Sequence, residues 1–370
     1  MTDGHGGTTR QTPLTRFLSW MAGEKVDSAF LTSSTTIRYL TGFRAQTMER
    51  LMALAISGEV AALVLPSIEE EPAKAAARGV EVVAWKDGED PYAMVAEVLG
   101  TRPERLALET DHLTLQGHRR LEERVRARTL VDAAPALQDL RLRKTAQEIA
   151  LLQDAARITD QVTGSVLAHA RAGMTEIEIG RLIDDAILGA GAQLSFSTLA
   201  QAGAASADPH HQPGKQHLRR GNYLLLDFGA AVEGYCADTT RTACCGTPSA
   251  EQLQIFDLVL RAHDAAIAAI RPGVTTGAID EAARRVIREG GHAEHFFHRV
   301  GHGLGLDAHE APSLDPGSAL VVEPGMVFTI EPGVYLPGWG GVRIEDDVVV
   351  TDGGCRLLTR AARELVPLPA

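Results

Sequence analysis

Two pairs of acidic residues, each spanning a turn signal, constrain the fold of this chain more than any other feature of its sequence. Asp227 ends the apolar run LLLD, and Asp238 follows eleven residues later, with Glu233-Gly234 midway between them. A hairpin folded at that turn brings the two aspartates opposite each other, with Cβ atoms about 4.5–5.5 Å apart. The pattern therefore predicts neighbouring strands that hold two carboxylates face to face.

The second acidic pair lies near the C-terminus, in FTIEPGVYLPGWGGVRIED. Glu331 and Glu345 are fourteen residues apart, and residues 337–340 supply the turn between them. Like charges opposite each other destabilise a sheet, and buried carboxylates without a partner carry a large desolvation cost. A single acid would be interpreted as an ordinary surface residue. Two symmetric pairs in one domain predict cations that neutralise them.

A glycine-rich segment between the two hairpins, FFHRVGHGLGLDAHE, contributes His298, His302 and His309. Its alternating glycines at 301–305 allow close approach of the backbone. We expect one imidazole to complete the carboxylate site and the others to carry protons or bind substrate. Such a hard, oxygen-rich site suits Mn²⁺, Co²⁺ or Zn²⁺. Two such ions would activate a water and polarise a carbonyl, so the expected reaction is metal-assisted hydrolysis.

The first third of the chain alternates short apolar runs with amphipathic stretches, which indicates an α/β domain over residues 13–138. We expect strands near 29–33, 51–57, 60–66, 80–85 and 105–109, and helices near 12–23, 67–79 and 91–100. The segment has no glycine-rich phosphate loop and no cluster of histidines and acids, so we expect a lid or an oligomerisation domain. Residues 1–12 lack the apolar core of a secretory signal and are expected to be a flexible N-terminus.

A charged segment opens the second domain. We place the boundary within 135–143 and assign residues 139–370 to the catalytic domain. Thr145 and Glu148 fit a capping box at the start of a long helix that ends before Gly173. Further helices are expected near 175–191, 251–270 and 276–290, followed by a strand-rich end.

Charge and cysteine content exclude several classes of partner. The net charge is −12, and no Lys/Arg run is long enough to follow a phosphate backbone, so nucleic acid is not an expected partner. The apolar stretches are too short to cross a membrane. The four cysteines lack the C-x-x-C spacing and are expected to be reduced thiols, which indicates a soluble cytoplasmic protein.

The whole pattern resembles the pita-bread metallopeptidases of the Xaa-Pro dipeptidase (prolidase) and aminopeptidase P type. The segments that carry the resemblance are, in order, RYLTGF, RLRKTAQEIALL, DFGAAVEGYCADTTRT, GHGLGLDAHE, TIEPGVY and GVRIED. The resemblance implies an α/β N-terminal domain followed by an α+β pita-bread (creatinase/aminopeptidase-like) catalytic domain. It also implies a homodimer and a proline-containing peptide as the substrate.

The same resemblance implies roles for individual residues. The implied metal ligands are Asp227, Asp238, His302, Glu331 and Glu345. They would hold two divalent ions, with Mn²⁺ favoured over Co²⁺ and Zn²⁺, and Asp238 and Glu345 would bridge them. Glu331 would also act as general base and acid. His210 in DPHH, His309 and Arg343 would contact the substrate or support the site, and Tyr335 would line the pocket. His298 would support the metal ligands and would take no direct part in catalysis.

Several alternatives stay open from the sequence. An aminopeptidase P would act on longer peptides, and a non-catalytic binding protein could keep the fold. A creatinase-like enzyme lacks this ligand set, and a methionine aminopeptidase has little chain before its catalytic domain. Some prolidases carry an arginine shortly after the HE pair for the dipeptide's carboxylate, where this chain has Ser313. The complete ligand set argues against the creatinase-like and the non-catalytic alternatives. The compact N-terminal domain suits short substrates and so favours an Xaa-Pro dipeptidase by a small margin over the aminopeptidase.

Overall fold

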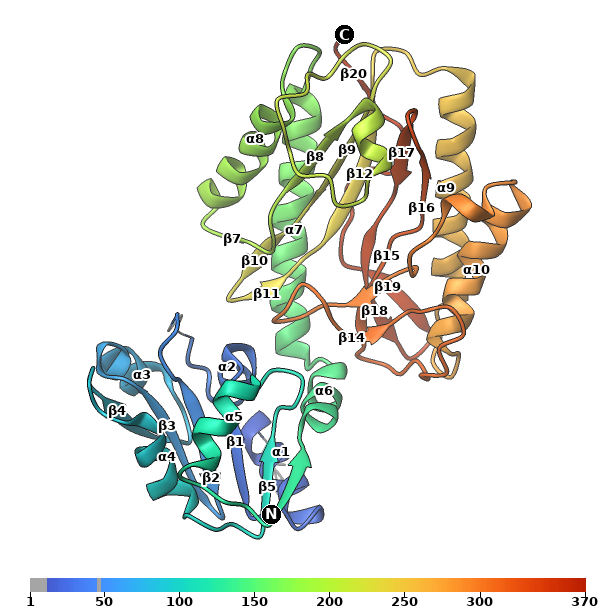
Figure 1. Ribbon diagram of the computed structural model, residues 1–370. Coiled ribbons are helices and arrows are strands. Elements are labelled where there is room, and N and C mark those ends of the chain that lie inside the picture. Colours follow the sequence, from blue (N-terminus) through green and yellow to red (C-terminus); the bar gives the residue numbers. More distant parts are fainter. Residues whose placement is uncertain (1–11, 45–47) are drawn as a thin grey trace, which may run out of the picture. The chain divides into compact units, whose positions relative to one another are not determined.

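The computed structural model describes residues 12–44 and 48–370 (Figure 1). The expectation for the first twelve residues therefore falls, apart from Thr12, outside the described residues. The chain divides into two compact units, Met1–Leu140 and Arg141–Ala370. Each unit has a buried hydrophobic core of its own.

The N-terminal unit is built on a six-stranded sheet with the strand order β4-β3-β2-β1-β5-β6. Its strands are β1 (Ser28–Leu31), β2 (Ala53–Ser57), β3 (Val60–Pro66), β4 (Glu81–Trp85), β5 (Arg105–Leu108) and β6 (Thr129–Asp132). The pairs β1–β2 and β2–β3 are antiparallel, and the other three pairs are parallel. The helices are α1 (Pro13–Gly23), α2 (Ser34–Thr41), α3 (Glu70–Ala76), α4 (Pro91–Leu99) and α5 (Leu115–Glu122), and α6 (Ala134–Leu142) spans the division between the units.

The five strands and three helices expected in this unit are present, whereas α2, α5 and β6 were not predicted. Helix α2 was missed because its sequence, STTIRYLT, is rich in β-branched residues, which lower helix propensity. Packing overrides that preference, since Ile37 and Leu40 are buried. The helix begins after Ser33, whose side chain accepts from the Thr36 N–H, and ends at Gly42 with φ 80°.

The C-terminal unit packs helices against several small sheets. The helices are α7 (Ala146–His169), α8 (Glu176–Gly189), α9 (Ala250–Ala269) and α10 (Thr276–Glu289). The strands are β7 (Gln193–Leu194), β8 (Leu199–Ala202), β9 (Tyr223–Phe228), β10 (Ala230–Val232), β11 (Tyr235–Cys236), β12 (Thr239–Cys245), β13 (His302–Gly303), β14 (Glu310–Ser313), β15 (Val327–Ile330), β16 (Gly333–Leu336), β17 (Gly340–Arg343), β18 (Asp346–Thr351), β19 (Gly354–Leu357) and β20 (Pro367–Leu368). The larger sheets have the orders β20-β12-β9-β8 and β14-β13-β15-β18-β19.

Two helical layers enclose these strands. Figure 1 shows α7 and α8 on one side of the strands of this unit and α9 and α10 on the other. Ile183 of α8 packs in one core with Phe228 of β9, and Val259 of α9 packs in the other with Val342 of β17. The predicted capping box at Thr145 is present at the start of α7. No helix in the described ranges is long and apolar enough to cross a bilayer.

The first acidic hairpin forms with a different register from the one predicted. In the antiparallel pair β9–β12, Asp227 lies opposite Thr240 rather than opposite Asp238. The two acids are not symmetric about the turn: Glu233 and Gly234, both with positive φ, pair Val232 with Tyr235 in β10–β11, and the same register places Asp227 opposite Thr240. Asp238 therefore precedes β12, and the expected face-to-face pairing is wrong by two residues.

The second acidic hairpin and the glycine-rich segment follow the prediction. In the pair β16–β17 the outermost partners are Gly333 and Arg343, so Glu331 and Glu345 each lie two residues beyond the paired part. A Cβ at Gly301 would lie 1.9 Å from the Thr329 carbonyl oxygen. Such a distance excludes any larger residue, so the backbone does approach closely at this glycine.

Candidate active site

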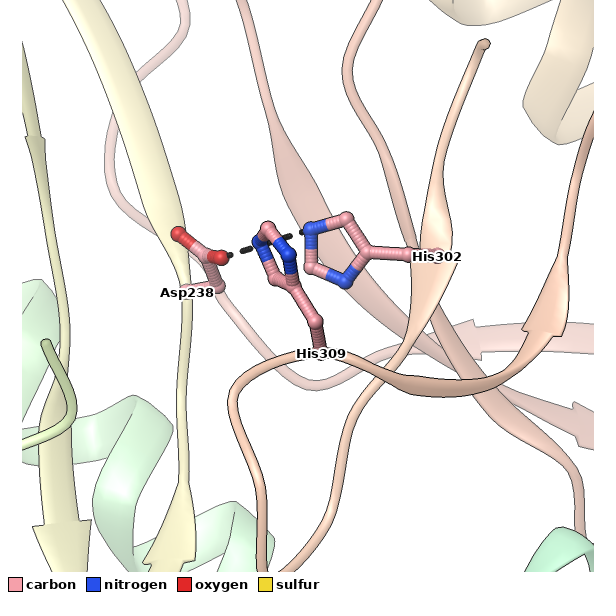
Figure 2. A group of neighbouring side chains, drawn as sticks. All are labelled: Asp238, His302 and His309. Atoms are coloured by element: carbon pink, nitrogen blue, oxygen red, sulfur yellow. Dashed lines mark ion pairs between the residues drawn. The ribbon is translucent and has the colours of Figure 1, made fainter. Parts of the chain in front are cut away.

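Carboxylates from both hairpins converge with imidazoles in the C-terminal unit. Three overlapping groups of possible metal ligands result: Asp227, Asp238 and Glu345; His302, Glu331 and Glu345; and Asp238, His302 and His309. Within each group the ligand atoms lie within 4.8 Å of one another. Figure 2 shows Asp238, His302 and His309 with their polar atoms turned toward one another. Asp238, Glu345 and His302 each belong to two groups, and of these three the two carboxylates have a second oxygen with which they could contact a second ion.

The carboxylates of this cluster carry more negative charge than the protein neutralises. Burial raises the pKa of Asp238 well above its usual value, and the charges of Glu345 and Asp227 raise it further. Burial likewise raises the pKa of Glu345, although its Oε2 accepts a hydrogen bond of 2.6 Å from Thr240 Oγ1. Asp227 Oδ1 and Asp238 Oδ1 are buried and accept no hydrogen bond. These oxygens fit divalent cations, which would supply the missing charge and ligand partners.

The orientation of the His302 ring suits a metal ligand. Its Nδ1 lies 3.1 Å from the carbonyl oxygen of Gly303, which accepts the Nδ1–H of one tautomer. Nε2 is then left with its lone pair, 3.3 Å from Glu331 Oε1 and 3.6 Å from Asp238 Oδ2. Burial lowers the pKa of His302 to about 4, so the ring is neutral near neutral pH. A neutral imidazole held by a backbone carbonyl is the usual form of a metal-ligating histidine.

All three guanidinium nitrogens of Arg343 donate hydrogen bonds to side chains at the cluster. Its Nη2 donates to Asp227 Oδ2 at 2.5 Å, its Nε donates to Thr240 Oγ1 at 2.8 Å, and its Nη1 donates to the Tyr335 hydroxyl at 2.9 Å. The Tyr335 hydroxyl also lies 2.9 Å from His298 Nε2. Arg343, Tyr335 and His298 therefore form a hydrogen-bonded chain that fixes one carboxylate of the cluster.

A cavity of about 940 Å³ opens onto the cluster. Its walls are Phe196, Ser197, Leu199, Asp208, Pro209, His210, Gln212, Asp227, Asp238, Phe297, His298, Arg299, His302, Ala308, His309, Glu331, Tyr335, Arg343 and Glu345. All the candidate site residues named from the sequence are therefore brought to one cavity. Within the DPHH segment, His210 faces the cavity, whereas His211 Nε2 lies 3.0 Å from the buried Glu176.

Two ion pairs of the neighbouring residue Glu310 anchor the loop that carries His309. The His309 ring centroid lies 3.9 Å from that of His302, and burial lowers the pKa of His309. The next residue, Glu310, forms an ion pair of 2.8 Å with Lys144 Nζ and a second ion pair with Arg141. This role of Arg141 and Lys144 could not be predicted from the sequence, because both residues lie far from Glu310 along the chain.

A second buried network forms around Asp346 and Asp347, the two residues after Glu345, and it was not predicted from the sequence. Asp346 Oδ1 accepts from Arg241 Nη2 at 2.7 Å, and its Oδ2 lies 3.1 Å from His263 Nε2. Burial opposes the charge of Asp346, but Arg241 and His263 outweigh burial and lower the pKa of this carboxyl to about 2. Asp347 Oδ2 accepts the backbone N–H of Asp238 at 3.0 Å. The only signal in the sequence was two acids at the start of the apolar run DDVVV.

Family comparisons cover most of the chain. Residues 150–352 match Metallopeptidase family M24, and residues 13–143 match the Creatinase/Prolidase N-terminal domain. The putative dipeptidase YkvY of Bacillus subtilis (strain 168) is 37% identical over 358 residues, which covers 95% of this chain and 99% of that protein.

Solved structures resemble the chain over nearly its whole length. The Xaa-Pro dipeptidase from Bacillus anthracis is 34% identical with a TM-score of 0.89, and the match covers 96% of this chain and 99% of that one. The prolidase from Pyrococcus furiosus is 31% identical with a TM-score of 0.86, covering 94% and 100%. The expected fold, an α/β N-terminal domain followed by a pita-bread catalytic domain, is confirmed.

Proposed function

The chain belongs to metallopeptidase family M24 and is a metal-dependent peptidase, and we propose that it is an Xaa-Pro dipeptidase. It would hydrolyse the peptide bond in front of proline in very short peptides. The convergence of four carboxylates and His302 on one cavity supports this proposal most directly. Aminopeptidase P activity on longer peptides is the alternative, and the relative cleavage of an Xaa-Pro dipeptide and an Xaa-Pro-Xaa tripeptide distinguishes the two activities.

We assign the metal ligands to five residues of the cluster: Asp227, Asp238, His302, Glu331 and Glu345. Asp227 and Asp238 would hold the first ion, His302 and Glu331 the second, and Asp238 and Glu345 would contact both. Mn²⁺ is the proposed ion, and Co²⁺ or Zn²⁺ would suit the same donors. When bound, the ions supply Lewis acidity and lower the pKa of a water molecule.

The remaining assignments concern groups that handle protons and the substrate. Glu331 lines the cavity beside His302, so its carboxylate can accept a proton and return it to the leaving nitrogen. His309 also faces the cavity, and its ring can donate a hydrogen bond to the oxygen of the scissile carbonyl. His210 is exposed at the cavity and can contact the rest of the peptide. Arg343 and Tyr335 keep the carboxylate of Asp227 in place.

The cavity suits a proline-containing peptide. Phe196, Leu199 and Phe297 supply apolar lining, against which a pyrrolidine ring can pack. The bond in front of proline has no N–H, so the site needs no acceptor for that nitrogen. Four free cysteines suit a reducing compartment, and we place the enzyme in the cytoplasm. A homodimer is part of the same proposal and rests on the family resemblance alone.

Metal stoichiometry tests this assignment. Protein freed of metal and dialysed against Mn²⁺ should retain two ions per chain by plasma mass spectrometry and should cleave an Xaa-Pro dipeptide only in the metal-loaded form. Asp257→Asn is the matched control, because Asp257 is an exposed carboxylate of α9 paired with Arg261 outside the cluster. Full hydrolysis by the metal-free protein, or no retained metal, would contradict the proposal.

A further inference from the structure

Arg299 brings a permanent positive charge to a cavity whose other permanently charged groups are mainly carboxylates. It lines the cavity and is half-buried. Its Nη1 donates a hydrogen bond of 2.7 Å to Ser313 Oγ, which holds the guanidinium in place. Within the described ranges, no carboxylate forms an ion pair with Arg299, so its charge is not neutralised by the protein.

The other basic groups of the cavity cannot serve an anionic ligand in the same way. Arg343 is buried, and its Nε, Nη1 and Nη2 all donate to side chains of the protein. The remaining basic side chains of the cavity wall are histidines, which carry no permanent charge near neutral pH. Arg299 is therefore the cation of this wall that has donors left for a ligand, in a fork that matches a carboxylate.

The pairing of β13 with β14 places the guanidinium of Arg299 next to the metal cluster. Ser313, the partner of Arg299, lies opposite His302 in the antiparallel register, next to a bulge at His302 and Gly303. Residues directly opposite in such a pair have Cβ atoms about 4.5–5.5 Å apart. The guanidinium is thus held beside His302, a proposed metal ligand.

That spacing matches a dipeptide better than a longer peptide. In an Xaa-Pro dipeptide, three bonds separate the scissile carbonyl carbon from the terminal carboxylate carbon, so the two lie within about 4 Å of each other. Each added residue moves the carboxylate about 3.3–3.6 Å further away. We propose that Arg299, held by Ser313, binds the free carboxylate of the proline residue and so selects dipeptides. This inference rests on the proposed function.

Kinetics on a charged and an uncharged substrate test the inference. Mn²⁺-loaded wild-type protein, Arg299→Gln, Arg299→Lys and Ser313→Ala are compared on leucyl-proline and on leucyl-prolinamide, which lacks the carboxylate. Arg299→Gln should lower kcat/KM for leucyl-proline about 10- to 150-fold, mainly through KM, as expected for a lost hydrogen bond to a charged group. The fall for leucyl-prolinamide should be less than about threefold, because no charge is bound there. Arg299→Lys should recover part of the loss, and Ser313→Ala should show a smaller one.

Controls separate this inference from the proposed function. Arg285→Gln, at an exposed arginine of α10, should leave both substrates unaffected, and thermal unfolding should show that every variant is folded. An equal loss on both substrates, or no loss on either, would overturn the role of Arg299. If the wild type cleaves neither substrate, the proposed function fails. Calorimetry with free proline then decides on Arg299 alone: wild type should bind proline at least about tenfold more tightly than Arg299→Gln, and equal binding would refute the subsite.

Discussion

Removing the charge of Glu310 should destabilise the C-terminal unit strongly. The Lys144 side chain is 2% exposed and that of Glu310 is 7% exposed, and Nζ lies 2.8 Å from Oε1. Lys144 Nζ makes no hydrogen bond that would compensate its burial, so this ion pair is its compensation. In Glu310→Gln, Arg141 keeps Asp307 as a partner, whereas the buried ammonium of Lys144 keeps none.

The size of the effect follows from burial. Breaking a buried ion pair by removing one partner costs about 3–5 kcal/mol, because the other charge stays buried and unpaired. For a unit of 150–250 residues, each 1 kcal/mol lowers Tm by about 2–4 °C. Glu310→Gln should therefore lower the Tm of the C-terminal unit by roughly 6–20 °C.

Differential scanning calorimetry on a set of matched variants checks this value. Glu323→Gln is the control, since the ion pair of Glu323 with Arg143 has both side chains more than 40% exposed, and exposed pairs contribute about 0–1 kcal/mol. The double variant Lys144→Met/Glu310→Gln removes both buried charges and should recover most of the lost stability. If Glu310→Gln shifts Tm no more than Glu323→Gln, or if the double variant recovers nothing, the reasoning is wrong.

Three further predictions concern the metal cluster and the thiols. Asp238→Asn should lower kcat at least about 100-fold with an unchanged circular dichroism spectrum, since a metal ligand loses its charge; near-normal turnover would exclude a two-metal site. Adding metal to the metal-free protein at about 100 times Kd should stabilise it by about 2.7 kcal/mol, a Tm rise of roughly 5–11 °C by calorimetry; an unchanged Tm would contradict binding to the folded state. Burial raises the pKa of Cys236 to about 11, so native protein at pH 8 should react with Ellman's reagent at fewer than about one of its four thiols within minutes; rapid reaction of all four would show that the thiols are accessible.

Local patterns in the sequence predicted much of the site. Glu331 and Glu345 are symmetric about a glycine-rich turn, and the hairpin between them has the register that this symmetry requires. The capping box at Thr145 is likewise a signal contained within four residues. Such features could be predicted because the residues that determine them are neighbours along the chain.

Features that depend on distant partners could not be predicted in this way. The register of the first hairpin was wrong because the spacing of the two acids does not reveal which residues form the turn: the turn at Glu233 and Gly234 pairs Val232 with Tyr235 and so places Asp227 opposite Thr240. Asp346 resembles a surface acid in the sequence, but it is buried and pairs with Arg241 and His263. Both partners lie more than eighty residues away along the chain. The pairing of Lys144 with Glu310 has the same character, since only tertiary packing determines it.

The most direct test of the central claim is a comparison of three substrates under one set of conditions. The Mn²⁺-loaded protein is given an Xaa-Pro dipeptide, the matching Xaa-Pro-Xaa tripeptide and an Xaa-Ala dipeptide, and kcat/KM is measured for each. An Xaa-Pro dipeptidase should cleave the first best and the Xaa-Ala control poorly. Preferred cleavage of the tripeptide would instead identify an aminopeptidase, and cleavage of neither proline substrate would contradict the proposed function.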